Sequence, residues 1–279
     1  MNTHYFGSSQ QPLLGIHHPP RLGTSRDHAV LICAPIAHEH LRTHWALRLL
    51  AQRLAREGFD VMRFDYTGIG DSYASTEEVD SLHRWVDDVQ LATDDLLAES
   101  GCSRLSMIGL RFGTVLAMLA ARDPLSVDHL ILWEPVLDGE DYLRQLRHMH
   151  DRMIDLWVCP VTTQDDDLGE EILGFTYPRA LLNEIAAIDT VKLSPDCNRL
   201  TIIDGQGESP TDVAKRLTNA KRSFSCPTSV VEAIDRSDWD DLRQIETAWL
   251  PAHSQTVVIN AAKESISALA QTSLAGVTT

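Results

Sequence analysis

The side chain best placed for chemistry in this sequence is that of Arg111. It stands at the centre of Gly109-Leu-Arg-Phe-Gly113, between an apolar run and a run rich in small residues. Flanking glycines permit a sharp turn from a strand into a helix, which presents the central side chain beside the helix N-terminus. A guanidinium stays protonated and cannot act as an acyl-accepting nucleophile. We therefore expect Arg111 to grip a carboxylate, a phosphate or a developing oxyanion.

A buried ion pair is the alternative role for Arg111, and the two roles can hold together. An arginine at the base of a pocket loses hydration, and an unpaired buried charge is costly. We therefore expect Arg111 to contact a carboxylate when no ligand is bound, with Glu39 and Glu134 as the candidates.

His38, Glu39 and His40 form a second polar cluster after the apolar run 29–34. Glu39 could act as a general acid or base, and either histidine could carry a proton near neutral pH. A solvated loop without a catalytic role is the alternative for all three residues. These histidines and His44 make a weak metal pattern, with no His-Glu-x-x-His motif and no thiolate pair. We expect no metal and no other cofactor.

Strand-like and helix-like patterns alternate along the chain, and these elements must position the polar residues. Predicted strands cover 29–34, 61–64, 105–108, 129–133, 200–203 and 228–233. Predicted helices cover 44–57, 82–99, 114–122, 212–217 and 256–270. This alternation predicts βαβ units and a mostly parallel sheet, with the first 28 residues as an antiparallel hairpin at its edge.

Residues 141–195 break the alternation and are predicted to form a helical cap inserted over the strand ends. The core domain would then consist of 1–140 and 196–279. Asp65 and Asp71 are expected to tie down the glycine-rich loop between them.

Two further motifs carry a resemblance to the α/β-hydrolase superfamily, which extends over nearly all of the chain from about residue 25. The segment Arg63-Phe-Asp-Tyr-Thr-Gly-Ile-Gly-Asp-Ser72 looks like the D-x-x-G-x-G-x-S loop of the serine-aminopeptidase-like branch. Residues 34–40 occupy the position of the oxyanion-hole loop. The resemblance implies an α/β-hydrolase fold, with a mostly parallel sheet of about eight strands and a small helical cap.

A narrower resemblance rests on Gly-Leu-Arg-x-Gly at the nucleophile turn and on Leu-Trp-Glu-Pro-Val-Leu-Asp-Gly at 132–139. Both are similar to the hydrolase-like proteins encoded beside exosortase or polysaccharide loci and in natural-product clusters. That resemblance implies a role in biosynthesis, and it indicates the fold far better than the reaction.

The resemblance also shows what the chain lacks for serine-type hydrolysis. Glu208 stands at the position of the triad acid, with Asp204 just before it, and is either a relic or the partner of Arg111. Trp239 lies where the triad histidine would be. Without a histidine, no base activates a substitute hydroxyl. His253, close to Pro251, is more typical of a surface residue than of a replacement base.

Ligands of open α/β sheets bind beyond the carboxyl ends of parallel strands. The substrate-binding positions expected on this ground and around the turn are Leu110, Phe112, Glu134, Asp138 and Trp239. The six tryptophans are expected to pack in the core or the cap: Trp45, Trp85, Trp133, Trp157, Trp239 and Trp249.

Composition limits the partners. The formal net charge is −16, which argues against nucleic acid and anionic membrane surfaces. No apolar run is long enough to span a bilayer, and no signal peptide is apparent. The five cysteines are scattered without a C-x-x-C pair, so a reducing cytoplasm fits best. The expected partner is a small-molecule or carrier-bound acyl substrate, and a homodimer is compatible with the sequence.

Two kinds of function follow. In the first, the chain is an enzyme with non-covalent chemistry, in which Arg111 holds an anionic or acyl group and Glu39 moves a proton with help from His38 or His40. Hydrolysis, acyl or lactone rearrangement, cyclisation and elimination all fit. In the second, a catalytically inactive pocket binds such a metabolite, or the chain scaffolds a biosynthetic complex. The fold alone does not decide between these functions. The carboxylates expected around Arg111 favour the enzyme, because a protein that only binds an anion gains nothing from several carboxylates beside one arginine.

Overall fold

The computed structural model describes residues 1–21, 24–122, 126–156, 169–205, 224–235, 237–244 and 247–275, the last of these as backbone only from residue 265 onward. Its main element is an eight-stranded sheet with the order β1-β2-β4-β3-β5-β6-β9-β10. The bounds are β1 (Asn2–Ser8), β2 (Gln11–His18), β3 (Ala29–Cys33), β4 (Asp60–Phe64), β5 (Leu105–Leu110), β6 (His129–Trp133), β9 (Leu200–Gly205) and β10 (Thr228–Ala233).

The sheet is parallel from β4 through β10, and β1 and β2 form the antiparallel hairpin predicted at its edge. Every residue of β3, β5 and β6 is buried. Short apolar runs of this kind suit parallel strands whose two faces are both covered by helices. The prediction of a mostly parallel sheet of about eight strands is therefore confirmed.

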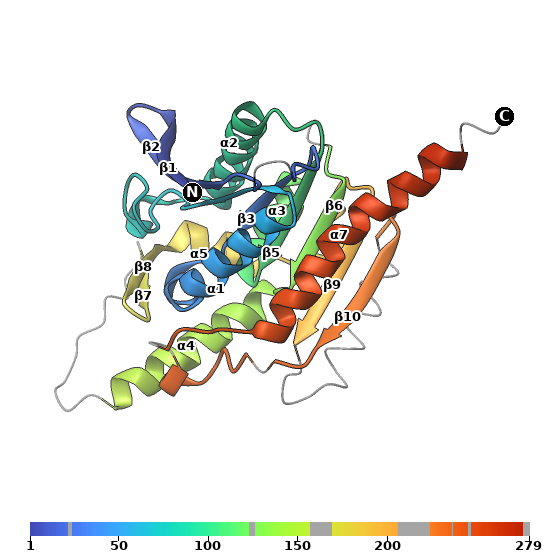
Figure 1. Cartoon of the computed structure of the whole chain (residues 1–279). Coiled ribbons are helices and arrows are strands. Elements are labelled where there is room, and N and C mark those ends of the chain that lie inside the picture. Colours follow the sequence, from blue (N-terminus) through green and yellow to red (C-terminus); the bar gives the residue numbers. More distant parts are fainter. Residues whose placement is uncertain are drawn as a thin grey trace.

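Helices cover the sheet on both sides. Their bounds are α1 (Ala37–Arg56), α2 (Leu82–Ser100), α3 (Phe112–Ala120) and α7 (Ala252–Ala275), with short 3₁₀ turns at Thr76–Glu78, Thr190–Lys192 and Leu242–Gln244. Helix α1 contacts α7, and α2 contacts α3. Figure 1 shows α1 and α7 crossing in front of the sheet. None of the described helices is long and apolar enough to cross a membrane.

Helix α1 begins seven residues earlier than predicted, and this changes the place of His38, Glu39 and His40. All three lie in its first turn and are buried, so the expectation of a solvated loop is wrong. The start carries no sequence signal, because the N-cap residue Ile36 makes no side-chain cap and Ala37 has a φ of 52°. Polar N-caps are what mark a helix start in a sequence.

The segment 141–195 is not wholly helical. It contains most of α4 (Gly139–Asp155), then the antiparallel strands β7 (Gly169–Ile172) and β8 (Phe175–Pro178), and then α5 (Arg179–Ala186). Leu173 and Gly174 join the two strands with φ values of 52° and 81°. A two-residue turn with positive φ at both positions usually announces itself with Asn-Gly or Asp-Gly, and Leu-Gly does not. The assignment of 141–195 as a separate cap remains a prediction.

The strand order changes direction at β3, which lies between β4 and β5 in the sheet. The chain leaves β3 towards β4 on one side and returns through β5 on the other. Ligand sites of open α/β sheets lie at such a switch point, beyond the carboxyl ends of the strands. The start of α1 and the start of α3 meet there, which brings Glu39 and Arg111 together.

Candidate functional site at the β5–α3 turn

Arg111 occupies a strained turn between β5 and α3, as predicted. Its φ and ψ are 52° and −124°, which few side-chain-bearing residues adopt. A Cβ added at Gly109 would lie 2.6 Å from the Thr114 Cα, and one added at Gly113 would lie 2.2 Å from the Cys33 carbonyl oxygen. Both glycines are thus required by close backbone packing. The Thr114 hydroxyl donates to the Arg111 carbonyl oxygen at 2.6 Å and closes the turn.

The predicted ion pair of Arg111 is with Glu39. The Arg111 Nε donates to Glu39 Oε1 at 2.9 Å, and the two side chains are 12% and 1% exposed. The Tyr142 hydroxyl, from α4, donates to Glu39 Oε2 at 3.1 Å. Both carboxylate oxygens of Glu39 are therefore engaged. Burial works to lower the pKa of Arg111, but the Glu39 charge and hydrogen bond, together with Tyr142, raise it above its ordinary value.

Two aromatic rings contact the Arg111 guanidinium. Its Cζ lies 5.0 Å from the Trp239 ring centroid and 5.7 Å from that of Tyr142. Such contacts hold a planar cation in one orientation. The two terminal nitrogens, Nη1 and Nη2, make no hydrogen bond to any described residue. The Nε edge is thus fixed by Glu39, and no described residue uses the donors of the two terminal amino groups.

Glu134 follows β6 and is the second buried carboxylate at this site. It accepts hydrogen bonds from the Ser237 hydroxyl and from the Trp239 indole Nε1–H. A Cβ at Gly205 would lie 2.4 Å from Glu134 Oε1, so the end of β9 leaves room for this carboxyl group. Burial raises the pKa of Glu134, although the bonds from Ser237 and Trp239 act in the opposite direction. Glu134 makes no ion pair with Arg111.

The order of these groups parallels a serine-type catalytic triad. The turn residue Arg111 contacts the ring of Trp239, and the Trp239 N–H points to the Glu134 carboxyl group. An indole N–H only donates, whereas an imidazole both donates and accepts protons. An indole at this position therefore cannot do the proton transfer of an imidazole. The sequence-based placements of Trp239 at the histidine position and of Glu134 as a substrate contact stay predictions, and Glu208, the acid suggested by the sequence, lies outside the described residues.

Arg42 is a part of the site that sequence reasoning missed. Its Nη2 and Nη1 donate to the carbonyl oxygens of Ser237 at 2.7 Å and Asp238 at 3.1 Å, and its Cζ lies 5.0 Å from the Trp239 ring. It thereby holds the loop that carries Trp239. Burial lowers the pKa of Arg42, against the effect of the Glu39 charge. Its position three residues after Glu39, on the same helix face, is the signal that could have found it.

The two histidines beside Glu39, His38 and His40, have different charged neighbours. His40 Nε2 lies 3.5 Å from Asp65 Oδ1, while the charges that act on His38 are those of Glu39, Arg111 and Arg42. Residues two apart on a helix lie about 200° apart around its axis, so they cannot share a face. Burial lowers the pKa of both histidines, which favours their neutral forms. His38 therefore lies within the electrostatic influence of Arg111 and Glu39. His40 contacts the loop that starts at Asp65, whose carboxylate also accepts the Asp71 N–H at 3.1 Å.

The remaining predicted positions have the following contacts. Leu110 and Phe112 are fully buried, and Phe112 stacks on Tyr142 with ring centroids 5.4 Å apart. They support the site from the core, and substrate contact by them stays a prediction. The Asp138 carboxylate accepts the Asp141 N–H at 2.9 Å and caps α4. His253 is exposed and accepts the Ile234 N–H at 3.3 Å.

Asp204, at the end of β9, supplies the clearest pH dependence. Burial and the nearby Glu134 and Glu232 charges raise its pKa to about 6. The folded chain then holds a proton that the unfolded chain loses at about pH 4, so the free energy of unfolding falls as pH rises between about 4 and 6. We expect Asp204→Asn to remove this fall, which urea unfolding of both chains between pH 4.5 and 7 would measure. An equal pH dependence of the free energy of unfolding in wild type and Asp204→Asn would contradict the prediction.

Among the described residues, no cluster of three histidine, cysteine or carboxylate side chains could hold a metal ion.

Comparison with known proteins supports the fold. Residues 27–233 match the family model of the serine aminopeptidase, S33. The alpha/beta hydrolase GrgF from Penicillium sp. sh18 is 14% identical, with a TM-score of 0.65 over 95% of this chain and 97% of that one. Proline iminopeptidase of Mycobacterium smegmatis is 12% identical, with a TM-score of 0.64 over 96% and 100%. Mouse alpha/beta hydrolase domain-containing protein 10 is 16% identical, with a TM-score of 0.60 over 96% and 100%.

No curated protein matches the chain in sequence. The structural likenesses, at identities of 12–16%, show the fold alone. The family model covers most of the chain, and its span contains both the β5–α3 turn and the strands that frame it. The chain therefore belongs to the serine aminopeptidase S33 family and has the α/β-hydrolase fold.

Proposed function

We propose that this family member binds an anionic metabolite, or an anionic acyl group, at the β5–α3 turn without forming a covalent intermediate. The observation that carries the proposal is the state of the Arg111 side chain. Its Nε is bonded to Glu39, its plane is held by Trp239 and Tyr142, and its terminal nitrogens have no partner among the described residues.

The chemistry of the site favours a carboxylate or phosphate over a neutral ester. Two parallel N–H donors of one guanidinium match two oxygens of such a group, and a charge-assisted pair is stronger than a neutral hydrogen bond. The residues around Arg111 are largely buried, which strengthens the attraction between its guanidinium and an anionic ligand, because water competes less for the hydrogen bonds. Arg42 adds a second cation near Trp239.

Glu39 fits the role of counter-ion better than that of proton carrier. Its oxygens accept from Arg111 and Tyr142, and only 1% of its side chain is exposed. A general base must be within reach of the proton that it removes. The acid–base role of Glu39 stays a prediction, and it requires the ligand to displace one of these bonds.

An enzyme with acid–base chemistry is the second candidate function, and Asp204 favours it. A carboxyl group with a pKa of about 6 exchanges protons near neutral pH, and the Glu134 charge that raises that pKa belongs to the site. Hydrolysis, rearrangement, cyclisation and elimination are all open to such a group. A place in a biosynthetic pathway is proposed on the sequence resemblance alone.

The binding proposal is tested by calorimetry with a panel of small carboxylates, acyl phosphates and acyl thioesters. We expect at least one anionic ligand to bind the wild-type chain, and Arg111→Lys to weaken it by roughly 10- to 100-fold, the worth of one or two charged hydrogen bonds. Lysine keeps the charge but loses the planar fork.

Arg144→Lys is the matched control, because Arg144 is 67% exposed on α4. It should leave the affinity unchanged. Equal affinity of wild type and Arg111→Lys for every bound anion would contradict the proposal. Turnover of any panel member by wild type, lost in Asp204→Asn, would favour the enzyme.

A further inference from the structure

Helix α1 exposes large apolar side chains along one stripe. Leu41, Trp45 and Leu49 are 67%, 52% and 41% exposed and lie at positions i, i+4 and i+8 of the helix. This corrects the expectation that Trp45 packs in the core or the cap. Leu250, in the segment that leads into α7, is 58% exposed. A row of exposed apolar residues on one helix face is typical of an interaction surface.

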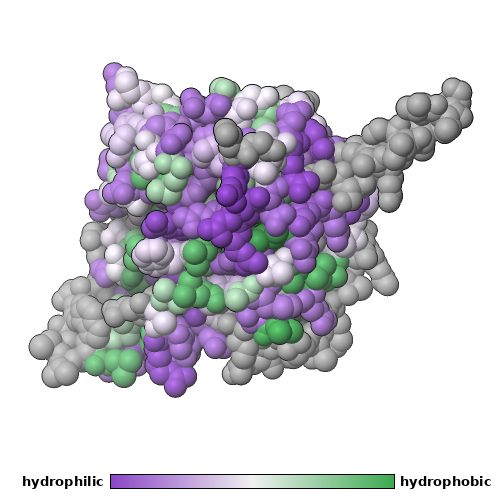
Figure 2. Space-filling view, in the orientation of Figure 1, coloured by the Kyte–Doolittle hydropathy of each residue, from purple (hydrophilic) through white to green (hydrophobic). Residues whose placement is uncertain are grey.

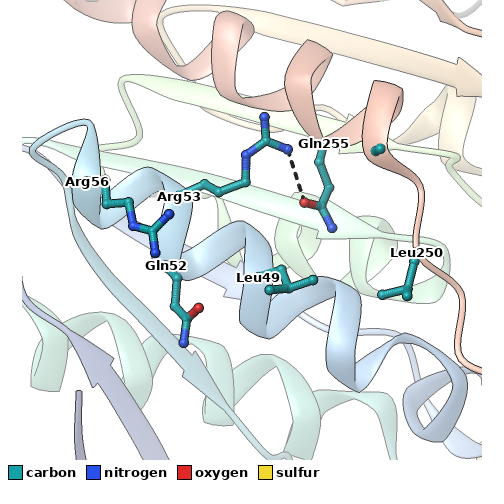
Figure 3. Close-up of a pocket in the computed structure, with 7 residues that line it drawn as sticks. Leu49, Gln52, Arg53, Arg56, Leu250 and Gln255 are labelled. Atoms are coloured by element: carbon teal, nitrogen blue, oxygen red, sulfur yellow. Dashed lines mark hydrogen bonds between the residues drawn. The ribbon is translucent and has the colours of Figure 1, made fainter.

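A shallow pocket adjoins this stripe between α1 and the start of α7 (Figure 3). Its volume is about 310 Å³, and Leu49 and Leu250 supply large apolar side chains to its lining. The Arg53 side chain crosses it, donating to the Gln255 side chain at 3.2 Å and to the Thr256 hydroxyl at 2.9 Å. The pocket is thus apolar in part and framed by donors.

Three arginines flank the same stripe. Arg48, Arg53 and Arg56 have no carboxylate partner among the described residues, although the chain carries a net charge of −16. Arg48 lies with its Cζ 5.2 Å from the Trp45 ring. Figure 2 shows strongly hydrophilic and hydrophobic residues side by side over the front face, where α1 lies in Figure 1. These arginines thus form a row without described carboxylate partners on a chain of net negative charge.

We propose that this surface, defined by Leu41, Trp45, Arg48, Leu49, Arg53, Arg56 and Leu250, docks an acidic amphipathic helix of a partner protein. Arg48 and Arg56 lie eight residues apart, or about 12 Å along the helix axis, so carboxylates two turns apart on a partner helix can face both. An apolar residue between those carboxylates would enter the pocket beside Leu49. Complementary charge of this kind sets partner choice and orientation.

A helix suits the surface better than an anionic membrane does. The net charge of −16 repels a charged bilayer over a wide area, whereas a single helix meets only the basic row. The pocket is recessed between two helices, which a flat lipid surface cannot fill. The proposal does not depend on the ligand of Arg111.

Selection from a displayed library tests it without assuming a partner. The library presents one fixed helical scaffold with eight randomised exposed positions, and the full chain is the labelled target. We expect enriched helices to carry Asp or Glu at i and i+7 or i+8, with an apolar residue between them. Their affinity should fall at least tenfold for Arg48→Glu/Arg56→Glu, and should fall with added salt.

The control variant Arg144→Glu/Lys192→Glu makes the same charge change at residues that are 67% and 81% exposed elsewhere. Binding by this control should match wild type. No enrichment, enrichment without acidic residues, or equal loss in the control would each overturn the proposal. So would self-association in light scattering, or sedimentation with phosphatidylglycerol vesicles, that Arg48→Glu/Arg56→Glu abolishes.

Discussion

Glu39→Gln is expected to destabilise the folded chain by about 3–5 kcal/mol, more than the double replacement Glu39→Gln/Arg111→Gln. The single change leaves a guanidinium that is 12% exposed without its counter-ion, while the double change removes both charges. The loss of stability in Glu39→Gln comes from the uncompensated charge of Arg111. The ion pair itself contributes little, because desolvation offsets much of the attraction between two buried ions. Urea unfolding at pH 7 measures both.

Two control measurements test whether the loss is specific to the buried charge. Tyr142→Phe removes one hydrogen bond from Glu39 and should cost about 1 kcal/mol. A second cycle on Arg199 and Glu264, which are 34% and 63% exposed, should show a coupling below about 1 kcal/mol. Additive losses in the Glu39–Arg111 cycle would show that the two residues do not stabilise each other.

Arg111→Ser is expected to remain unreactive towards a fluorophosphonate, whereas Arg111→Ser/Trp239→His should react at least 100-fold faster. The single variant restores Gly-x-Ser-x-Gly at the turn, but the Trp239 indole N–H cannot accept the proton of the serine. The double variant supplies an imidazole beside Glu134, which already accepts the Trp239 N–H and the Ser237 hydroxyl. Intact-mass measurement of the adduct over time decides the comparison.

Wild type should give no adduct at any serine of the site, Ser237 included. Glu134→Gln added to the double variant should slow labelling by roughly 100-fold or more, since a carboxylate orients the histidine and stabilises its cation. Circular dichroism confirms folding of each chain. Equal labelling with and without Trp239→His would mean that another base serves the turn, and indifference to Glu134→Gln would remove Glu134 from the acid position.

The fold was predictable from the sequence because periodicity and turn residues agree along most of it. Apolar runs mark the buried strands, and Gly109 and Gly113 mark the turn at Arg111 by the close packing that they allow. Prediction failed where the local signal is weak. Ile36 gives α1 no polar cap, and Leu173-Gly174 turns β7 into β8 without a typical turn pair.

The site was predictable only in part, for a related reason. The pair of Arg111 and Glu39 follows from the need of a buried cation for a carboxylate. The contacts of Arg42 with Ser237 and of Glu134 with Trp239 join residues 195 and 105 positions apart in the chain. Such contacts depend on the meeting of loops from distant strands, which no local pattern encodes.

Four residues that frame the site have left-handed backbone angles without being glycine. Ala37, Arg111, Glu134 and Asp238 have φ values between 42° and 52°. Each such residue costs about 1–3 kcal/mol, and their sum is a large share of the roughly 5–15 kcal/mol that keeps a domain folded. Selection for stability alone would favour glycine at these four positions, because glycine adopts a positive φ without strain. Strained backbone kept at four positions around one turn is the trade-off expected where the geometry of a site, and not stability alone, has been selected.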